Sequence, residues 1–432
     1  MTKLKEKQNS ANSELNPRTV DLEFFGVIGS TIVSIGTPLF LMIQYVICTD
    51  TGCPNNIPNM LRLFSFSHMF SWTAAKIYLG WLAYHLLMWL IVPGEWVKGT
   101  KLRNGGYVEY KQNGFKVLLI TLTLSVVTFF TVGHTPFLVI YDNFFQLLCT
   151  AIVFTTLAAL YLHQSSYAPN KLLSLNGNSG HFIYDFWMGR ELNPSIGCLD
   201  LKEFFELRPG LMGWIMLNLC MLAKQYDQLN GKLTFSMLFV TLSQIYYVID
   251  SLYNQSCVLT TMDIINDGFG YMLMFGDVAW VPFFYTLQAR YLTITHVELG
   301  WNQIVFVLAM NVIGYIIFRQ ANGQKDKFRS NPNDPSLAHI SYIETDTGRR
   351  LMTSGWWGIA SHINYFGDWI MSFSQCLACG YTNLIPYFFA VYFFILLVHR
   401  DSRDDHNCGL KYGKYWKQYR QLVPYRIIPY VY

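Results

Sequence analysis

Long apolar runs separated by short polar connections dominate the chain. The runs carry few or no charges, and most extend over about twenty residues, which is enough to cross a bilayer as a helix. The runs cover residues 24–48, 72–92, 117–140, 144–162, 233–249, 269–287, 304–318 and 366–398. This pattern predicts a polytopic, all-α membrane protein.

The last apolar run is too long for one crossing. Gly380 to Asn383 interrupt it, which indicates a helical hairpin. A shorter apolar run at residues 211–223 adds one more candidate. The sequence therefore predicts about ten transmembrane helices.

Composition agrees with a membrane protein. Hydrophobic residues make up 52% of the 432 residues, and only 13% are charged, whereas about a quarter are charged in ordinary soluble proteins. Lys and Arg gather before the first run and in the segments 98–116, 171–208, 319–350 and 400–426. By the positive-inside rule, both termini and these segments are expected in the cytosol.

The polar segment 1–20 has no apolar core before a cleavage site, so we expect a short disordered cytosolic tail rather than a signal peptide. The nine cysteines are scattered, which disfavours a zinc module. Cys48 and Cys53 lie close together in a segment expected on the lumenal side. A disulfide and two free thiols both remain open for this pair.

Four carboxylates fall in or beside the apolar runs: Asp250, Asp263, Asp267 and Asp277. Each costs roughly 2.5 to 3.5 kcal/mol to insert when ionised, so such residues usually face a cavity or a partner. Pairing with Arg290 or Lys224 would account for one or two of them. The presence of four carboxylates favours a polar chamber within the helix bundle. Five tyrosines from the same part of the chain would share this chamber: Tyr246, Tyr247, Tyr253, Tyr271 and Tyr285.

Two clusters near the carboxyl end fit a nucleotide. Lys325 and Arg329 are four residues apart, so on a helix they share one face and could bind a phosphate; basic residues beside a span are also what topology alone requires. After the last run, residues at helical spacing offer cations for phosphates, a carboxylate for ribose and tyrosines for stacking. These are Arg400, Asp404, Cys408, Lys411, Tyr412, Tyr415 and Tyr419.

Two alternatives for this carboxyl-terminal face are weaker. An amphipathic helix on the membrane surface would need an apolar stripe that the face lacks. A metal site from Asp404, Asp405, His406 and Cys408 has no second His or Cys nearby. The chain contains no GxGxxG motif, so a nucleotide would bind outside a Rossmann fold.

Several linked motifs resemble those of the sterol reductases, the family of the Δ14-reductases, the C24(28)-reductases and the lamin B receptor. The resemblance covers nearly all of the chain after residue 20. It rests on GRELNP (189–194), YVID (247–250), GDVAWVPFFYTLQARYL (276–292), ANGQKDKFR (321–329), SGWWG (354–358) and HINYFGD (362–368). CLACG (376–380) and the pattern at residues 403–408 favour the Δ7 branch of the family, which contains the 7-dehydrocholesterol reductases. This resemblance implies a role in cholesterol-type sterol biosynthesis in the endoplasmic reticulum.

The resemblance implies a transmembrane sterol chamber within residues 21–318 and an NADPH-binding region within 319–432. It implies a cytosol-facing cofactor pocket lined by Lys325, Arg329, Met352, Trp357, Asn364, Tyr365, Asp404, Cys408, Gly409, Leu410, Lys411, Tyr412 and Tyr419. The sterol substrate would enter from the surrounding membrane lipids, and no nucleic acid partner is implied.

Reduction of an isolated ring alkene requires a proton donor, because the alkene accepts hydride only once it has become a cation. Carboxylates in a medium of low dielectric constant would stabilise that cation. The candidates for these catalytic roles are Tyr247, Asp250, Asp263 and Asp368, and the sequence does not choose the proton donor among them.

The chain departs from the family pattern at three places. It has Ser361 before His362 where relatives have Arg, Gln255 where they have Glu, and Asn266 where they have His. Alternatives therefore include reduction of another sterol double bond such as Δ14, and a sterol-binding membrane protein with impaired catalysis. A chromatin-binding role like that of the lamin B receptor is disfavoured by the short segment before the first run. A transporter is disfavoured because no inverted repeat is visible.

Overall fold

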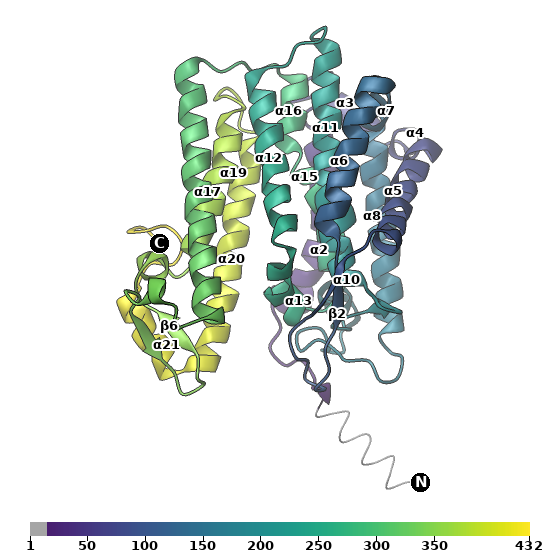
Figure 1. The fold of residues 1–432 in the computed structure, drawn as a ribbon. Helices are drawn as coiled ribbons and strands as arrows, with labels where there is room; N and C mark the ends of the chain where they lie inside the picture. Colours follow the sequence, from purple (N-terminus) through teal and green to yellow (C-terminus); the bar gives the residue numbers. More distant parts are fainter. Residues whose placement is uncertain (1–14) are drawn as a thin grey trace. The chain divides into compact units, whose positions relative to one another are not determined.

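The computed structural model describes residues 15–432, and they are mostly helical (Figure 1). Residues 1–14 of the predicted amino-terminal tail lie outside the described residues. Just after them, the Thr19 backbone N–H donates to Asn178 O (3.1 Å) and the Asn16 side chain donates to Lys171 O (3.0 Å). Residues 16–19 are therefore bound to the loop that contains residues 171–178.

The chain divides into two compact units. Unit 1 comprises Met1–Leu233 and Gln244–Thr295, and unit 2 comprises Thr234–Ser243 and His296–Tyr432. The helix α12 (Phe235–Tyr253) contributes residues to both units.

Unit 1 is a bundle of long helices with short helices and hairpins at their ends. The long helices are α2 (Gly26–Val46), α5 (Trp72–Ile91), α6 (Gly114–Thr131), α8 (Phe144–Ser165) and α11 (Leu211–Gln228). The short helices are α3 (Ile57–Leu63), α4 (Phe66–Met69), α7 (Thr135–Asp142), α9 (Phe182–Met188), α10 (Leu201–Phe205), η2 (Gln255–Thr260), α13 (Met262–Ile265), α14 (Tyr271–Phe275), α15 (Val281–Phe284) and α16 (Leu287–Ile294). Two antiparallel hairpins pair β1 (Glu95–Lys98) with β2 (Glu109–Gln112), and β3 (Ser195–Ile196) with β4 (Leu199–Asp200).

Within residues 15–432, six helical segments are long and apolar enough to cross a membrane: Gly26–Val46, Phe66–Ile91, Gly114–Thr131, Phe144–Ser165, Phe235–Tyr253 and Trp301–Ser330. Most of their apolar side chains face outward, as expected where lipid rather than water surrounds a bundle. The structure thus supports a polytopic helical membrane protein. The other predicted spans are short or interrupted, or they end in charged residues, so the expected number of about ten is not reached by these criteria.

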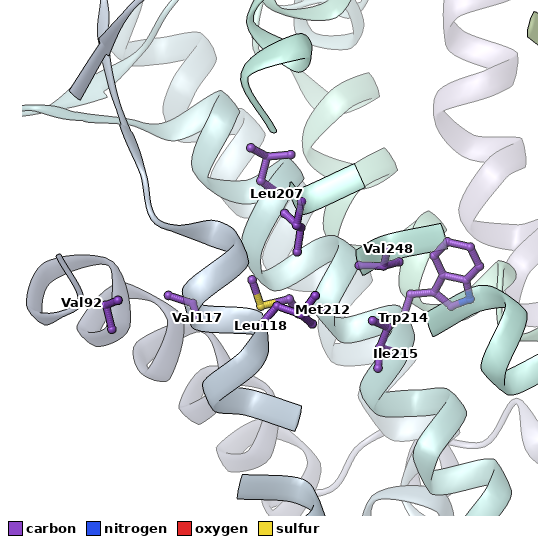
Figure 2. Packing of buried hydrophobic residues seen from close by; sticks show 9 residues of the cluster. Val92, Val117, Leu118, Leu207, Met212, Trp214, Ile215 and Val248 are labelled. Carbon is purple, nitrogen blue, oxygen red and sulfur yellow. The ribbon is translucent and has the colours of Figure 1, made fainter. Parts of the chain in front are cut away.

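A tightly packed cluster joins several elements of unit 1 (Figure 2). Its buried residues are Val92, Val117, Leu118, Leu207, Met212, Trp214, Ile215, Val248 and Leu252. The indole N–H of Trp214 reaches Gln244 Oε1 (3.1 Å) and Tyr285 O (3.0 Å), which satisfies the one polar atom of this ring. Since lipid tails are as apolar as these side chains, close van der Waals packing rather than transfer from water stabilises the cluster.

Two π-helical turns face one another in unit 1. They are η1 (Glu206–Gly210) and η3 (Gly276–Trp280). A Cβ added to Gly210 would lie 2.4 Å from Asp277 O, so only glycine permits this approach. The predicted span at 269–287 is therefore interrupted by a π-helical turn, a feature that often marks functional sites.

Cys48 and Cys53 form a disulfide, so the structure decides between the two alternatives for this pair.

Unit 2 contains a pair of closely packed helices, α17 (Trp301–Ser330) and α19 (Ile363–Leu377). Gly314 and Gly367 face each other where the helices cross, and a Cβ on Gly314 would lie 2.7 Å from Gly367 O. Small residues allow such close contact between membrane helices. α19 also packs against α20 (Tyr387–Tyr412).

The remaining elements of unit 2 lie in the segment between α17 and α19 and in the segment after α20. They are η4 (Pro335–Leu337), the hairpin of β5 (Tyr342–Glu344) and β6 (Arg350–Met352), α18 (Trp356–Ile359) and α21 (Lys414–Leu422). Gly413, with a φ of 52°, ends α20. The predicted continuous helical face is therefore wrong in one respect: Tyr415 and Tyr419 lie on α21, because the chain turns at Gly413.

Candidate functional site

The residues predicted to bind a nucleotide all lie in unit 2, on α17, β6, α18, α19, α20 and α21. The site is organised around three groups: the ring of Trp357 and its neighbours, the carboxylate of Asp404, and the imidazole of His362.

Trp357 is buried and held from two sides. Its indole N–H donates to Ala321 O (2.8 Å), and its own carbonyl accepts from the Tyr419 hydroxyl (3.3 Å). The Lys325 ammonium lies 3.8 Å from the centre of the ring, in a cation–π contact. Met352 packs in the small hydrophobic core around Trp357. These contacts fix the base of the predicted pocket.

Asp404 is an ionised group in a positive environment. Burial of this carboxyl would raise its pKa. The hydrogen bond from His362 and the positive charges of His362, Lys325 and Arg329 act in the opposite direction and lower the pKa below its ordinary value of 3.8. The predicted basic pair and the predicted carboxylate are thus brought together.

Cys408 lies one turn after Asp404 on α20, with its sulfur 3.9 Å from Asp404 Oδ2. Burial raises the pKa of the Cys408 thiol to about 12, and the charge of Asp404 adds to this shift. The side chain is therefore a neutral thiol at physiological pH and not a nucleophile or an anionic ligand.

His362 bridges two carboxylates. Its Nδ1 lies 2.8 Å from Asp401 Oδ1, and its Nε2 lies 3.1 Å from Asp404 Oδ2. Arg426, from the carboxyl-terminal segment, pairs with Asp401 (2.9 Å) and Asp405 (2.6 Å). The segment after α21 is thereby connected through Asp401 and His362 to the carboxylate of the predicted pocket.

This network was missed by sequence reasoning, which treated His362 only as part of a motif and Arg426 only as part of the basic segment 400–426. The Ser361 hydroxyl, at a position where the family pattern has Arg, accepts from Arg420 Nη1 (3.0 Å). Although Ser361 stands where the family pattern has Arg, a cation still lies next to this position, because Arg420 of α21 supplies it.

Asn364 and Tyr365 lie beside His362 at the start of α19. The Tyr365 ring stacks on the imidazole, with 4.7 Å between ring centres. The Asn364 amide donates to Asn322 Oδ1 (3.1 Å), while its own Oδ1 is buried without a hydrogen-bond partner among the described residues. A buried acceptor without a donor is unfavourable unless a ligand supplies one.

The end of α20 is more open than predicted. Leu410 is 76% exposed, Lys411 is exposed, and the Lys411 ammonium lies 5.2 Å from the Tyr412 ring centre. Gly409 lies on the same turn. These residues border the cluster around Asp404 rather than forming its base.

The four predicted catalytic residues are divided between the units. Tyr247 and Asp250 on α12 and Asp263 on α13 belong to unit 1, whereas Asp368 on α19 belongs to unit 2, where it is buried. The Tyr247 ring lies 5.9 Å from that of Trp214, and Asp250 Oδ1 accepts from the Asn254 amide (3.4 Å).

Two buried cations of unit 1 were also missed. Lys202 is fully buried, and its ammonium donates to Ile264 O (2.9 Å) and Asp267 O (2.7 Å). Arg208 forms a buried ion pair with Glu203 (2.8 Å). The alternative of Arg290 as partner of the aspartates receives no support, because its guanidinium hydrogen-bonds to Tyr45 O and Cys48 O.

Comparisons with known proteins identify the family. A family model described as the ergosterol biosynthesis ERG4/ERG24 family matches residues 18–432. The Delta(14)-sterol reductase erg24 of Schizosaccharomyces pombe is 44% identical over 98% of this chain and 100% of its own length. The Delta(14)-sterol reductase ERG24 of Saccharomyces cerevisiae is 41% identical over 97% of this chain and 100% of its own length. The Delta(14)-sterol reductase LBR of Gallus gallus is 41% identical over 94% of this chain and 64% of its own length.

The names of these similar proteins correct the expected Δ7 branch of the family. The prediction of a Δ7 (7-dehydrocholesterol) reductase is wrong, because similar proteins over nearly the full chain are named Delta(14)-sterol reductases. The motifs that suggested Δ7 lie in unit 2, where Cys376 donates to Pro386 O (3.2 Å) and Cys408 neighbours Asp404. Such contacts concern helix packing and the predicted cofactor pocket rather than the choice of sterol bond. The chain belongs to the ERG4/ERG24 family of sterol reductases.

Proposed function

We propose that this protein is an NADPH-dependent sterol Δ14-reductase of the endoplasmic reticulum membrane. The observation that carries the proposal is the cluster in unit 2, in which Lys325 lies over the rigidly held Trp357 ring and, with Arg329, places positive charge near Asp404. The names of the similar proteins support the sterol bond, and the apolar helices support membrane insertion.

The residues of unit 2 fit a phosphorylated dinucleotide. Lys325 and Arg329 offer charges for phosphate groups. The ionised Asp404 can accept hydrogen bonds from ribose hydroxyls, and the unpartnered Asn364 Oδ1 can accept one from an amide or hydroxyl. Bound NADPH would supply a hydride equivalent.

His362 would keep this pocket in its binding geometry. Because both of its nitrogens face carboxylates, it holds Asp404 against α19 while Arg426 holds Asp401. Asp404 is thereby preorganised, which lowers the cost of ordering on binding.

Chemistry at a Δ14 bond sets the remaining requirements. Besides the double bond, C14 carries two carbon substituents and C15 carries one, so a proton added to C15 leaves the more stable cation at C14, and hydride addition at C14 completes the reduction. A protein acid must therefore be within hydrogen-bond reach of C15. Tyr247, Asp250, Asp263 and Asp368 remain the candidates for this acid and for carboxylates that stabilise the cation.

The test uses a yeast strain that lacks its Δ14-sterol reductase. We expect the intact chain to replace Δ14-unsaturated sterols with products two mass units heavier, detected by mass spectrometry of extracted sterols. Lys325→Met should abolish this conversion. Lys327→Met is the matched control, because Lys327 is exposed and pairs with Asp334 (3.2 Å). Persistence of the Δ14 sterols with folded, membrane-inserted protein would contradict the proposal, as would equal activity of the two variants.

A further inference from the structure

An apolar cavity of about 400 Å³ lies within unit 1. It is partly open, and residues of α5, α6, α7, α8, η1, α11, η3 and α15 line it; three of these helices, α5, α6 and α8, belong to candidate membrane spans. A volume of this size is typical of sites for small molecules, which usually have a few polar groups in an apolar wall.

The cavity lacks the groups that the reduction needs. Among the described residues that line it there is no Asp, Glu, His, Lys or Arg, and Tyr247, Asp250 and Asp263 do not contribute to it. Its phenols are engaged: Tyr78 donates to Val278 O (3.1 Å), and Tyr84 lies 2.9 Å from the Thr121 hydroxyl. A ligand held here would be kept apart from the acids proposed for catalysis.

The hydrogen bond between the hydroxyls of Tyr84 and Thr121 has a defined direction. Thr121 Oγ1 donates to Val117 O (2.8 Å), so it must accept the proton of the Tyr84 hydroxyl. The lone pairs of the Tyr84 oxygen are then available to a donor in the cavity. The cavity therefore suits an apolar ligand that carries one hydroxyl group.

The wall is rigid. Pro136, Pro209 and Pro282 contribute to it, and the Trp81 indole is fixed by a hydrogen bond to Pro209 O (3.0 Å). At Gly80 an added Cβ would meet nothing within 4 Å, so the backbone itself forms part of the surface. A preformed wall favours a rigid fused-ring ligand over an acyl chain, because the rigid ligand loses less conformational freedom on binding.

We propose that this cavity binds an intact membrane sterol as a non-reacting ligand, with the sterol hydroxyl donating to Tyr84. The site is additional to the one at which the proposed reduction takes place, and its occupancy does not require turnover.

The experiment uses the full chain reconstituted in phosphatidylcholine vesicles that contain a diazirine-bearing sterol. Labelled peptides are identified by mass spectrometry. Gly80→Leu should fill the cavity without displacing the backbone. Gly36→Leu on α2 is the matched control, because an added Cβ there also meets nothing within 4 Å and Gly36 does not line the cavity.

We expect saturable labelling of peptides from α5, α6 or α11, competition by unlabelled sterol, and at least a fivefold loss of labelling in Gly80→Leu but not in Gly36→Leu. Sterol turnover should stay within twofold in both variants. Tyr84→Phe provides a second variant with the same expected loss of labelling if Gly80→Leu does not fold, because it removes the oxygen proposed to accept from the sterol hydroxyl.

Three results would overturn the proposal. Absence of labelling in these peptides would show that no sterol binds. Equal labelling by a diazirine-bearing phosphatidylcholine, not displaced by sterol, would identify an acyl chain as the occupant. A fall in turnover that parallels the loss of labelling would place the cavity on the substrate path. Failure of the proposed reduction alone would leave the labelling unaffected.

Discussion

Replacing His362 by Gln tests whether Asp404 is held in place by its neighbours. The side chain of His362 is 6% exposed and contacts Asp401 Oδ1 at 2.8 Å and Asp404 Oδ2 at 3.1 Å. Removing one partner of a buried ion pair costs about 3 to 5 kcal/mol when the other charge is left alone. In the variant, Asp401 still pairs with Arg426, and Asp404 still lies in the positive potential of Lys325 and Arg329. We therefore expect a smaller loss, about 1 to 3 kcal/mol of stability.

The affinity for NADPH should report the loss of the His362 contacts to Asp404 more directly than stability does. Gln can satisfy one carboxylate but not hold both, so we expect NADPH to bind about tenfold more weakly, which corresponds to ~1.4 kcal/mol. Quenching of the intrinsic tryptophan fluorescence on addition of NADPH provides the titration. His406→Gln is the control, because His406 is exposed on the same helix as Asp404. Affinity of His362→Gln within twofold of the control would refute the preorganisation of Asp404.

The pH dependence has a defined sign. The pKa of Asp404 is lowered in the folded protein, so its contribution is present at pH values above the ordinary pKa of 3.8 and is lost as the pH falls through the folded pKa. NADPH affinity should therefore not weaken through Asp404 between pH 8 and pH 5. In His362→Gln the Asp404 carboxyl loses the positive charge of His362, so its pKa rises and the weakening begins at a higher pH.

Three further outcomes are expected. Cys408, with a pKa raised to about 12, should alkylate much more slowly at pH 8 in the folded protein than after denaturation; equal rates by peptide mass spectrometry would contradict its burial. Arg208→Met should lower stability by about 3 to 5 kcal/mol, and adding Glu203→Leu should recover part of that loss in thermal unfolding, whereas additive losses would argue against a coupled pair. Gly314→Leu should lower the melting temperature strongly, because its side chain would meet the backbone of Gly367; an unchanged melting temperature would contradict the close helix crossing.

Sequence patterns anticipated the features that are local. Apolar runs predicted the long helices, and the spacing of Lys325 and Arg329 predicted that both would share one helix, α17. The same reasoning grouped Asp404 and Cys408 correctly, since both are on α20.

Features that depend on contacts distant in sequence were not predictable in the same way. Arg426 meets Asp401 only because the chain folds back after α21, and Lys202 meets Asp267 O only because α10 packs against α14 and the segment before it. The turn at Gly413 was also missed, since helical spacing alone gives no sign of a positive φ. The sterol bond was misassigned because the motifs used for it, residues 376–380 and 403–408, are explained by contacts within unit 2 such as Cys376 to Pro386 O and Cys408 to Asp404.

The most direct test of the central claim is the fate of a labelled hydride. Purified protein would be incubated with a Δ14-unsaturated sterol and NADPH that carries deuterium in the transferable position, and the product would be examined by NMR and mass spectrometry. We predict one deuterium at C14 and one solvent-derived hydrogen at C15. A product without deuterium at C14, or reduction at another ring bond, would contradict the proposed Δ14 reduction.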